Sequence, residues 1–412
     1  MEYVQFKSDF YISKKNFRTF KNPYGEKPYL DNNTLYIPIE MLAQEYKKNF
    51  NIKSEQEEED DQEQDEEINL GKRKPSGLEN IGGICYLNAV LQCFYYCRPL
   101  TEYFLRKDIK KNLGPISEGY FEFVNDLSSG KSCAAKKIKE AIMNVDETFI
   151  GNDGKDSKDV AILILSELQS ELQDEIDDKV SNSNNNKKVD HFNLLDIYNE
   201  KINQEKKSKT IISDTFNYLI KYVQMCENSC PKFKKKFFNI ESDNILIFEL
   251  EKIYNSIHKK DKYIKNPEIS LEECLNHYKW NEKIECPYCK DYTLIIKKTI
   301  CSLPKIFIFV LSRGHNIKFD CKINFNENLD MNKYFDPINE QKKGNNTYKL
   351  IGATFAYDWT KGYRHSGHTV AFCKSYNGNN NYYIFNDSRA IKSSISEIRN
   401  KTPYLLFYEK CI

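Results

Sequence analysis

The sequence predicts an α+β protein in which a helical part carries one functional segment and a β-sheet part carries the other. Apolar residues recur from Leu87 to Phe94 at i, i+3, i+4 and i+7, which is the spacing of an amphipathic helix that buries one face. Near the C-terminus, Tyr363 to Ser388 has the pattern of a strand, an Asn/Gly turn and a second strand. These two segments also contain the candidate functional residues.

Cys85 lies between a glycine-rich loop and this helix, which is expected to begin at or just after the cysteine. The positive end of the helix dipole favours a thiolate there, the form of cysteine that attacks carbonyl groups. Gly82 and Gly83 allow close approach of the backbone, and the Asn80 side-chain amide is a candidate donor to an oxyanion. A cysteine at this position can also be a small buried apolar residue with no catalytic role, so a catalytic assignment requires partner residues.

A base and an orienting group for Cys85 are expected in the C-terminal hairpin. His368 opens its first strand, and Asn386 and Asp387 close its second. If the hairpin turns near Asn377, residues whose numbers sum to about 755 lie opposite one another, so His368 faces Asn386 or Asp387. Alternation along the strand is expected to send Asn386 and Asp387 to opposite faces. His368 is preferred to His365, which sits in a polar loop.

These segments resemble the cysteine and histidine boxes of the ubiquitin-specific proteases. The first, Gly77 to Gln92, reads GLENIGGICYLNAVLQ, and the second spans Tyr348 to Tyr408. Between them, Ser270 to Cys289 followed by Lys297 to Arg313 resembles the stretch that leads from finger to palm in that family. The resemblance covers roughly residues 76–412.

The resemblance implies a papain-like α+β cysteine protease fold with a helical thumb, an antiparallel β palm and a β finger. It implies that Cys85 is the nucleophile and His368 the general base. Asn386 would be the third member, Asn80 the oxyanion donor and Asp387 a neighbouring acid that assists. The implied reaction is hydrolysis of an isopeptide or peptide bond at the C-terminal glycine of ubiquitin, which makes ubiquitin and ubiquitinated proteins the expected partners.

Three positions depart from the family pattern. Gly83 and Ile84 stand where a polar pair usually precedes the cysteine, and Thr369 stands where an aromatic residue commonly follows the histidine. The expected helix Lys158 to Gln169 lacks the glutamine and glutamate that are often found there. No departure removes a reacting atom. Three alternatives stay open: a ubiquitin-binding pseudoenzyme, a protease for a ubiquitin-like modifier, and a zinc-stabilised scaffold that recruits partners.

Two cysteine pairs have the spacing of metal ligands, Cys226 with Cys230 and Cys286 with Cys289. Four thiolates suit tetrahedral zinc, and the resemblance supports a structural zinc because the family often carries one in its finger. Zinc is the one expected cofactor, and catalysis needs none. The alternative is that the metal has been lost and the cysteines are structural remnants.

The chain is expected to begin with an extension, residues 1–53, which contains a strand at Leu35 to Ile39 and a helical piece at Glu40 to Phe50. Residues 54–75 include the run EQEEEDDQEQDEE and are expected to be a disordered linker, because such charge cannot be buried. A less favoured alternative is that this run is a docking tail for a basic partner.

The remaining residues, 76–412, are expected to form the catalytic domain. A disordered insertion is expected near residues 177–210, around the low-complexity run SNSNNNKK, and the finger near residues 222–295.

Composition argues against several other classes of protein. The net charge of +1 gives no reason to expect nucleic acid as the main partner. Thirteen irregularly spaced cysteines do not resemble a secreted disulfide framework. The longest apolar stretch, Ile306 to Leu311, is too short to span a bilayer, and the first residues show no signal pattern. A reducing cytoplasmic or nuclear setting is therefore expected, and the protein is expected to be a monomer.

Overall fold

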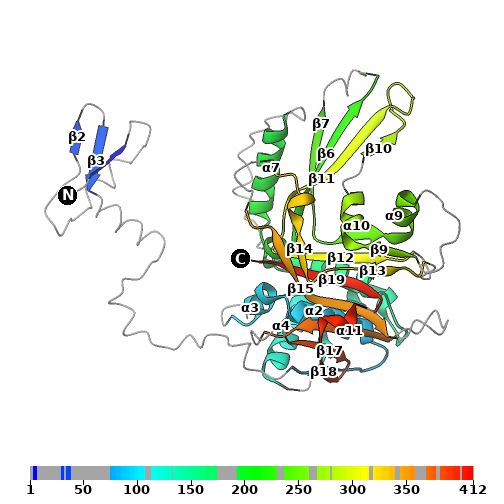
Figure 1. Ribbon diagram of the computed structural model, residues 1–412. Coiled ribbons are helices and arrows are strands. Elements are labelled where there is room, and N and C mark those ends of the chain that lie inside the picture. The colour runs from blue at the N-terminus through cyan, green and yellow to red at the C-terminus, as the bar shows by residue number, and fades with distance from the viewer. Residues whose placement is uncertain are drawn as a thin grey trace. The chain divides into compact units, whose positions relative to one another are not determined.

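The computed structural model shows a helix-and-sheet domain with a separate small sheet near the N-terminus (Figure 1). The chain divides into two compact units, Met1–Glu67 and Ile68–Ile412. The structure describes residues 3–6, 29–31, 34–38, 75–106, 113–131, 133–173, 193–228, 230, 236–258, 267–278, 281–314, 319–338, 344–357, 368–376, 381–399 and 401–411.

The first unit contains a three-stranded antiparallel sheet in the order β1-β3-β2. Its strands are β1 (Tyr3–Phe6), β2 (Tyr29–Asp31) and β3 (Thr34–Pro38). The strand expected at Leu35 to Ile39 coincides with β3, shifted by one residue. The helix expected at Glu40 to Phe50 and residues 54–74 of the expected linker lie outside the described residues.

The second unit begins with a helical subdomain, which corresponds to the expected thumb. Its helices are α2 (Cys85–Tyr95), α3 (Arg98–Phe104), α4 (Pro115–Ser128), α5 (Lys136–Val145), α6 (Ser157–Glu171) and α8 (Ile211–Phe216). The short strands β4 (Leu78–Glu79) and β5 (Cys133–Ala134) pair in parallel beside them.

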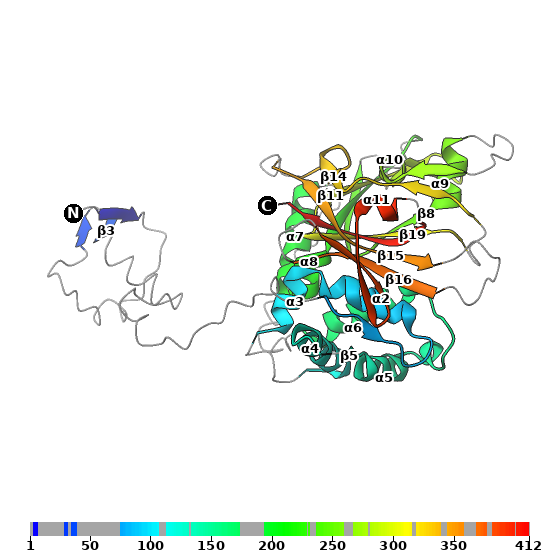
Figure 2. The same cartoon turned by 60° about the horizontal axis from the view of Figure 1, so that its bottom comes forward.

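Helix α2 begins at Cys85, as the sequence predicts, but it is not a surface helix with one buried face. All of its residues are buried, because it lies between α6 and the sheet strands β15 and β16, which run side by side with it in Figure 2. A helix enclosed on all sides needs little charge, and α2 carries no acidic residue in its first turn and no basic residue in its last.

The palm is an eight-stranded sheet in the order β18-β17-β16-β15-β19-β12-β8, with β14 beside β15. Its strands are β8 (Leu246–Glu249), β12 (Ile306–Ser312), β14 (Asn328–Asp330), β15 (Thr347–Tyr357), β16 (His368–Lys374), β17 (Tyr382–Asn386), β18 (Arg389–Ser393) and β19 (Pro403–Lys410). The expected antiparallel pairing holds except at one edge, where β8 runs parallel to β12.

Strand β12 is buried between two apolar cores. Its residues alternate between two apolar cores: Ile306, Ile308 and Val310 face the thumb core, and the residues between them face the opposite core. The longest apolar run of the sequence is therefore a strand that is buried on both faces. Within the described part of the chain, no helix has the length and hydropathy needed to cross a membrane.

The finger is a four-stranded antiparallel sheet in the order β10-β11-β6-β7, which extends from the palm on the side away from the thumb helices (Figure 1). Its strands are β6 (Tyr218–Cys226), β7 (Phe237–Asp243), β10 (Asn281–Ile284) and β11 (Leu294–Ser302). Beside the palm lie β9 (Glu268–Ser270), β13 (Lys322–Asn324), α9 (Leu250–Ile257) and α10 (Leu271–Tyr278), and α11 (Ile395–Ile398) lies between β18 and β19. The predicted α+β fold with thumb, palm and finger is confirmed.

The expected disordered insertion near residues 177–210 needs correction. Helix α7 (Leu194–Lys207) occupies part of it and is capped by the Asn193 side chain, which accepts a hydrogen bond from the Leu195 amide. Ile197 and Tyr198 are buried against the finger sheet, and this packing stabilises a helix whose other residues are mostly polar. The run SNSNNNKK lies within residues 174–192, outside the described part of the chain.

Candidate active site and metal centre

The first residue of α2 and the first residue of β16 meet at the junction of thumb and palm. Burial of the Cys85 thiol tends to raise its pKa, but a hydrogen bond with His368, assisted by the Thr369 backbone, brings the pKa below its ordinary value. The same hydrogen bond raises the pKa of His368 to about 9, against the opposing effect of burial. Cys85 is buried, with an exposed fraction of 7%. The pair favours a thiolate beside an imidazolium.

His368 Nε2 lies 2.6 Å from Asn386 Oδ1, which fixes the orientation of the imidazole ring. The hairpin pairs Ala371 with Phe385, so its register is shifted by one residue from the register expected from the turn. Continued along the strands, this register places Asn386 opposite Val370 rather than opposite His368. Residues two apart on a strand share a face, so His368 and Asn386 still meet as diagonal neighbours.

Asp387 does not follow the strand alternation predicted for it, so the expectation that it faces away from Asn386 is wrong. Strand β17 ends at Asn386, and Asp387 has a positive φ of 48°, which turns its side chain back toward the site. Its Oδ2 lies 3.7 Å from His368 Nε2. The Leu78 amide donates to the Asp387 carbonyl at 2.8 Å, and a Cβ on Gly77 would lie 2.2 Å from that oxygen. Gly77 therefore allows the cysteine box to pack directly on the turn.

Asn80 holds together the loop that precedes Cys85. Its Oδ1 accepts hydrogen bonds from the backbone amides of Gly82 and Ile84, and its Nδ2 donates to Asp387 Oδ2 at 3.0 Å. An amide nitrogen carries two hydrogens, so this contact with Asp387 uses one of them. The structure thus brings Cys85, His368, Asn386, Asp387 and Asn80 together in one cluster.

The glycine at position 83, which departs from the family pattern, is required by a close approach of the Asn152 backbone. Gly83 has a φ of 61°, and a Cβ there would lie 1.7 Å from the carbonyl oxygen of Asn152. The loop carrying Asn152 is held in place by buried Lys139, whose Nζ donates to the Phe149 carbonyl at 2.6 Å. Sequence reasoning did not identify Asn152, because no local pattern links it to Gly83; the glycine itself was the available signal.

Cys226, Cys230, Cys286 and Cys289 form a second cluster at the finger, with all four sulfurs within 4.8 Å of one another. The Sγ–Sγ distance is 3.5 Å from Cys226 to Cys230 and 3.8 Å from Cys230 to Cys286. Four sulfurs about 2.3 Å from a tetrahedral zinc would be about 3.8 Å apart. The pairs meet although they are far apart in sequence, because β6 pairs with β11 and Cys226 lies opposite Leu294. The cluster can bind a metal ion.

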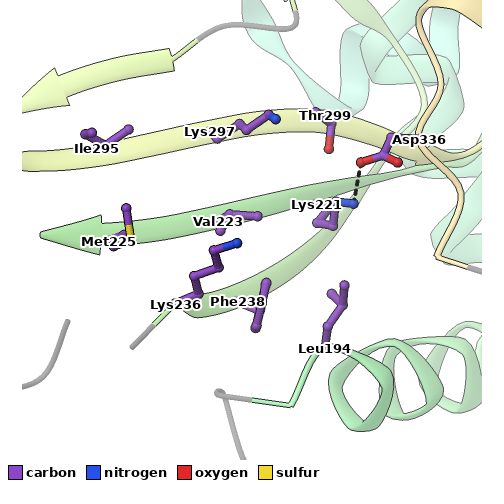
Figure 3. Close-up of a pocket in the computed structure, with 10 residues that line it drawn as sticks. All are labelled: Leu194, Lys221, Val223, Met225, Lys236, Phe238, Ile295, Lys297, Thr299 and Asp336. Carbon is purple, nitrogen blue, oxygen red and sulfur yellow. Dashed lines mark hydrogen bonds and ion pairs between the residues drawn. The ribbon is translucent and has the colours of Figure 1, made fainter. Parts of the chain in front are cut away.

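The finger sheet also lines a pocket of about 440 Å³, shown in Figure 3, which the sequence did not indicate. Its walls combine apolar side chains with lysines, and Lys221 pairs with Asp336 at 2.7 Å. The lining residues are Leu194, Lys221, Val223, Met225, Lys236, Phe238, Ile295, Lys297, Thr299 and Asp336. None of them belongs to the Cys85 cluster or to the four-cysteine cluster.

The chain is similar in sequence to known proteins over most of its length. Human ubiquitin carboxyl-terminal hydrolase 2 is 25% identical over 364 residues, covering 81% of this chain and 55% of that protein. Ubiquitin carboxyl-terminal hydrolase 19 of Arabidopsis thaliana is 24% identical over 352 residues, covering 82% of this chain and 46% of that protein. The chain spans about half the length of these curated relatives.

Among solved structures, the fold is similar to that of the SAGA DUB module of Ubp8, Sgf11, Sus1 and Sgf73. The module bound to monoubiquitin matches with a TM-score of 0.60 and 18% identity, covering 92% of this chain and 77% of that chain. The module bound to ubiquitin aldehyde matches with a TM-score of 0.57 and 19% identity, covering 82% and 70%. The family model described as "Ubiquitin carboxyl-terminal hydrolase" matches residues 76–408, which include both boxes and the finger. The chain belongs to the ubiquitin carboxyl-terminal hydrolase family.

Proposed function

We propose that the protein is a thiol-dependent deubiquitinase that hydrolyses isopeptide or peptide bonds at the C-terminal glycine of ubiquitin. The observation that carries this proposal is the hydrogen-bonded arrangement of Cys85, His368 and Asn386 at the junction of thumb and palm. Support for ubiquitin as the partner comes from the family and from the similar solved structures, which were captured with ubiquitin aldehyde and monoubiquitin.

In the proposed mechanism, the Cys85 thiolate attacks the carbonyl carbon of the terminal glycine. The oxyanion that forms accepts a hydrogen bond from the Asn80 amide. His368 gives its proton to the leaving amine, and a thioester between Cys85 and ubiquitin remains. His368 then takes a proton from water, whose oxygen attacks the thioester and releases the thiolate and the carboxylic acid, which loses its proton to solvent. Asn386 keeps the imidazole oriented through both steps.

The proposal is tested with the full chain and a ubiquitin that carries a fluorophore in amide linkage at its C-terminus. We expect release of the fluorophore with multiple turnovers. Binding of ubiquitin without turnover would identify a pseudoenzyme, and turnover of a ubiquitin-like modifier in place of ubiquitin would identify the related protease. Either result would contradict the proposal. If ubiquitin is turned over as expected, a panel of ubiquitin chains defines the preferred linkage.

The pH dependence of kcat/KM should be bell-shaped. The reactive pair needs a deprotonated Cys85 and a protonated His368, so activity appears as the lowered thiol pKa is passed and is lost as His368 deprotonates near pH 9. The charge of Asp387 contributes to the raised pKa of His368, so Asp387→Asn should move the alkaline limb to lower pH. An alkaline limb that does not respond to this substitution would contradict the assignment.

Asn386→Ala and Asp387→Ala should each lower kcat by about tenfold or more, which corresponds to about 1.4 kcal/mol of barrier. Asn386→Ala should be the more severe, because Asn386 contacts the imidazole at 2.6 Å whereas Asp387 lies at 3.7 Å. Stopped-time assays of kcat with the fluorogenic ubiquitin rank the two variants. If kcat falls less than tenfold in both, the proposed triad is wrong.

We also propose that the four-cysteine cluster holds one structural zinc ion, which would tie the ends of the finger strands together. The sulfur separations fit this ion, and the expected result is about one zinc per chain by elemental analysis of protein prepared under reducing, metal-replete conditions. Chelation should loosen the finger and weaken ubiquitin binding while largely preserving kcat, because Cys85 lies in the thumb. Absence of zinc would overturn the site.

A further inference from the structure

Asn88 lies three residues after Cys85 on helix α2 and faces the same turn that carries Asp387. Its Nδ2 donates to Asp387 Oδ1 at 2.9 Å and lies 3.3 Å from the Glu79 carbonyl oxygen. The side chain is almost fully enclosed, since Asn88 is 2% exposed. A charge-assisted hydrogen bond in such a sheltered position is stronger than one in water.

The other atom of this carboxamide has no partner: Asn88 Oδ1 is buried without a hydrogen bond. Turning the amide over would place that oxygen against the Glu79 carbonyl and the Asp387 carboxylate, so the observed orientation is the favourable one. An unsatisfied buried oxygen destabilises a fold, and an apolar residue of similar size would avoid that loss. Asn88 therefore stabilises the fold less than an apolar residue would, but it provides the hydrogen bond to Asp387.

The Asp387 carboxylate is held from two sides. Asn80 binds Oδ2 from the exposed loop, and Asn88 binds Oδ1 from inside the helix, which leaves Oδ2 at 3.7 Å from His368 Nε2. Among the described residues, the titratable groups that act on His368 are Cys85 on α2 and Asp387 on the turn after β17. The direction of the Asp387 carboxylate thus depends on a residue of the nucleophile helix.

We propose that Asn88 is a positioning residue that holds the Asp387 carboxylate beside His368, so that the imidazolium formed during the reaction is stabilised. The inference rests on the proposed deubiquitinase function, since it names a residue that supports the same site. The Asn88 side chain donates to Asp387 and to the Glu79 carbonyl, so its effect on His368 is expected to pass through Asp387.

The test is a double-mutant cycle in the full chain, with kcat and KM measured on the fluorogenic ubiquitin. Asn88→Leu should lower kcat by about tenfold with little change in KM, because it removes the donor and keeps the volume. In an Asp387→Ala background, Asn88→Leu should lower kcat by no more than about twofold. If the fold-loss of kcat in the double variant equals the product of the losses in the two single variants, Asn88 acts independently of Asp387 and the proposal is overturned.

Gln92 provides a matched control one turn further along the same helix. It is also a buried amide with an unpaired side-chain oxygen, but its side-chain nitrogen donates to the Ser76 carbonyl at 3.0 Å rather than to Asp387. Gln92→Leu should leave kcat within about twofold of the unmodified protein. An equal loss of kcat in the two variants would indicate a general effect on α2 and would also contradict the proposal.

A second measurement does not require turnover. Titration of His368 by NMR should give a lower pKa in Asn88→Leu and an unchanged pKa in Gln92→Leu, because only the former releases the Asp387 carboxylate. If the unmodified chain fails to hydrolyse ubiquitin, the proposed function fails, and this titration still decides whether Asn88 controls Asp387. An unchanged His368 pKa in folded Asn88→Leu would refute the role. If that variant does not fold, the same titration of Asn88→Ala decides in the same way.

Discussion

Replacing Cys85 with alanine should reduce turnover of the fluorogenic ubiquitin by about 10⁴-fold or more, because the reaction loses its nucleophile. The change removes one sulfur from a residue that begins α2 and leaves the packing of the helix in place. Thermal unfolding should therefore be nearly unchanged, and ubiquitin should bind with almost the same Kd.

Cys411→Ala is the control for this variant, since Cys411 is a partly exposed cysteine near the end of the chain. It should hydrolyse ubiquitin at the rate of the unmodified protein. Full activity in Cys85→Ala would remove the nucleophile assignment, and loss of activity in both variants would point to an unspecific effect of removing thiols.

His368→Ala should reduce kcat by a similar factor, about 10⁴-fold, because one side chain serves as acid and base in both halves of the reaction. It should also raise the pKa of Cys85, since the hydrogen bond and charge of His368 are what offset the burial of that thiol. Alkylation of Cys85 by iodoacetamide at neutral pH should consequently become slower.

Two other histidines serve as controls. His258 follows α9 and lies against Tyr254, with ring centroids 4.3 Å apart and the rings tilted by 35°, and His258→Ala should be active. His365→Ala is the sharper comparison, because His365 is only three residues from the proposed base and lies outside the described residues. An inactive His365→Ala beside an active His368→Ala would show that the wrong histidine was chosen.

The fold class was predictable from the sequence because its main signals are local. Helix α2 starts at the residue that the apolar spacing indicated, and the strands around His368 and Asn386 follow from alternation and a turn. The finger-to-palm stretch, which contains β11 and β12, was indicated by its resemblance to the family, whereas the helix and the hairpin show local patterns. Patterns of this kind depend on neighbours within about ten residues.

Errors arose where distant parts of the chain decide the structure. The periodicity of α2 could not show that α6 and the palm strands would enclose every face of it. Helix α7 was missed because its two buried residues, Ile197 and Tyr198, are stabilised by the finger sheet rather than by its own composition. The turn at Asp387 was missed because one positive φ reverses the direction that strand alternation gives to a side chain.

The site itself was partly predictable. Motif spacing was enough to name both the catalytic candidates and the four cysteines, whose sulfurs the structure brings together. It could not identify Asn152, which fills the space beside Gly83, or Asn88, whose partner Asp387 is 299 residues away in sequence. Such contacts depend on tertiary packing, which leaves no regular pattern in either segment.

We propose that Cys85 is a nucleophile directed at the C-terminus of ubiquitin. The most direct measurement is incubation of the full chain with a ubiquitin whose C-terminal glycine is replaced by a thiol-reactive group, followed by mass spectrometry of the adduct. We predict one ubiquitin per chain, attached to Cys85, with no labelling of Cys85→Ala and greatly slowed labelling of His368→Ala. Failure of the folded, reduced protein to form this adduct, or attachment at another cysteine, would contradict the proposal.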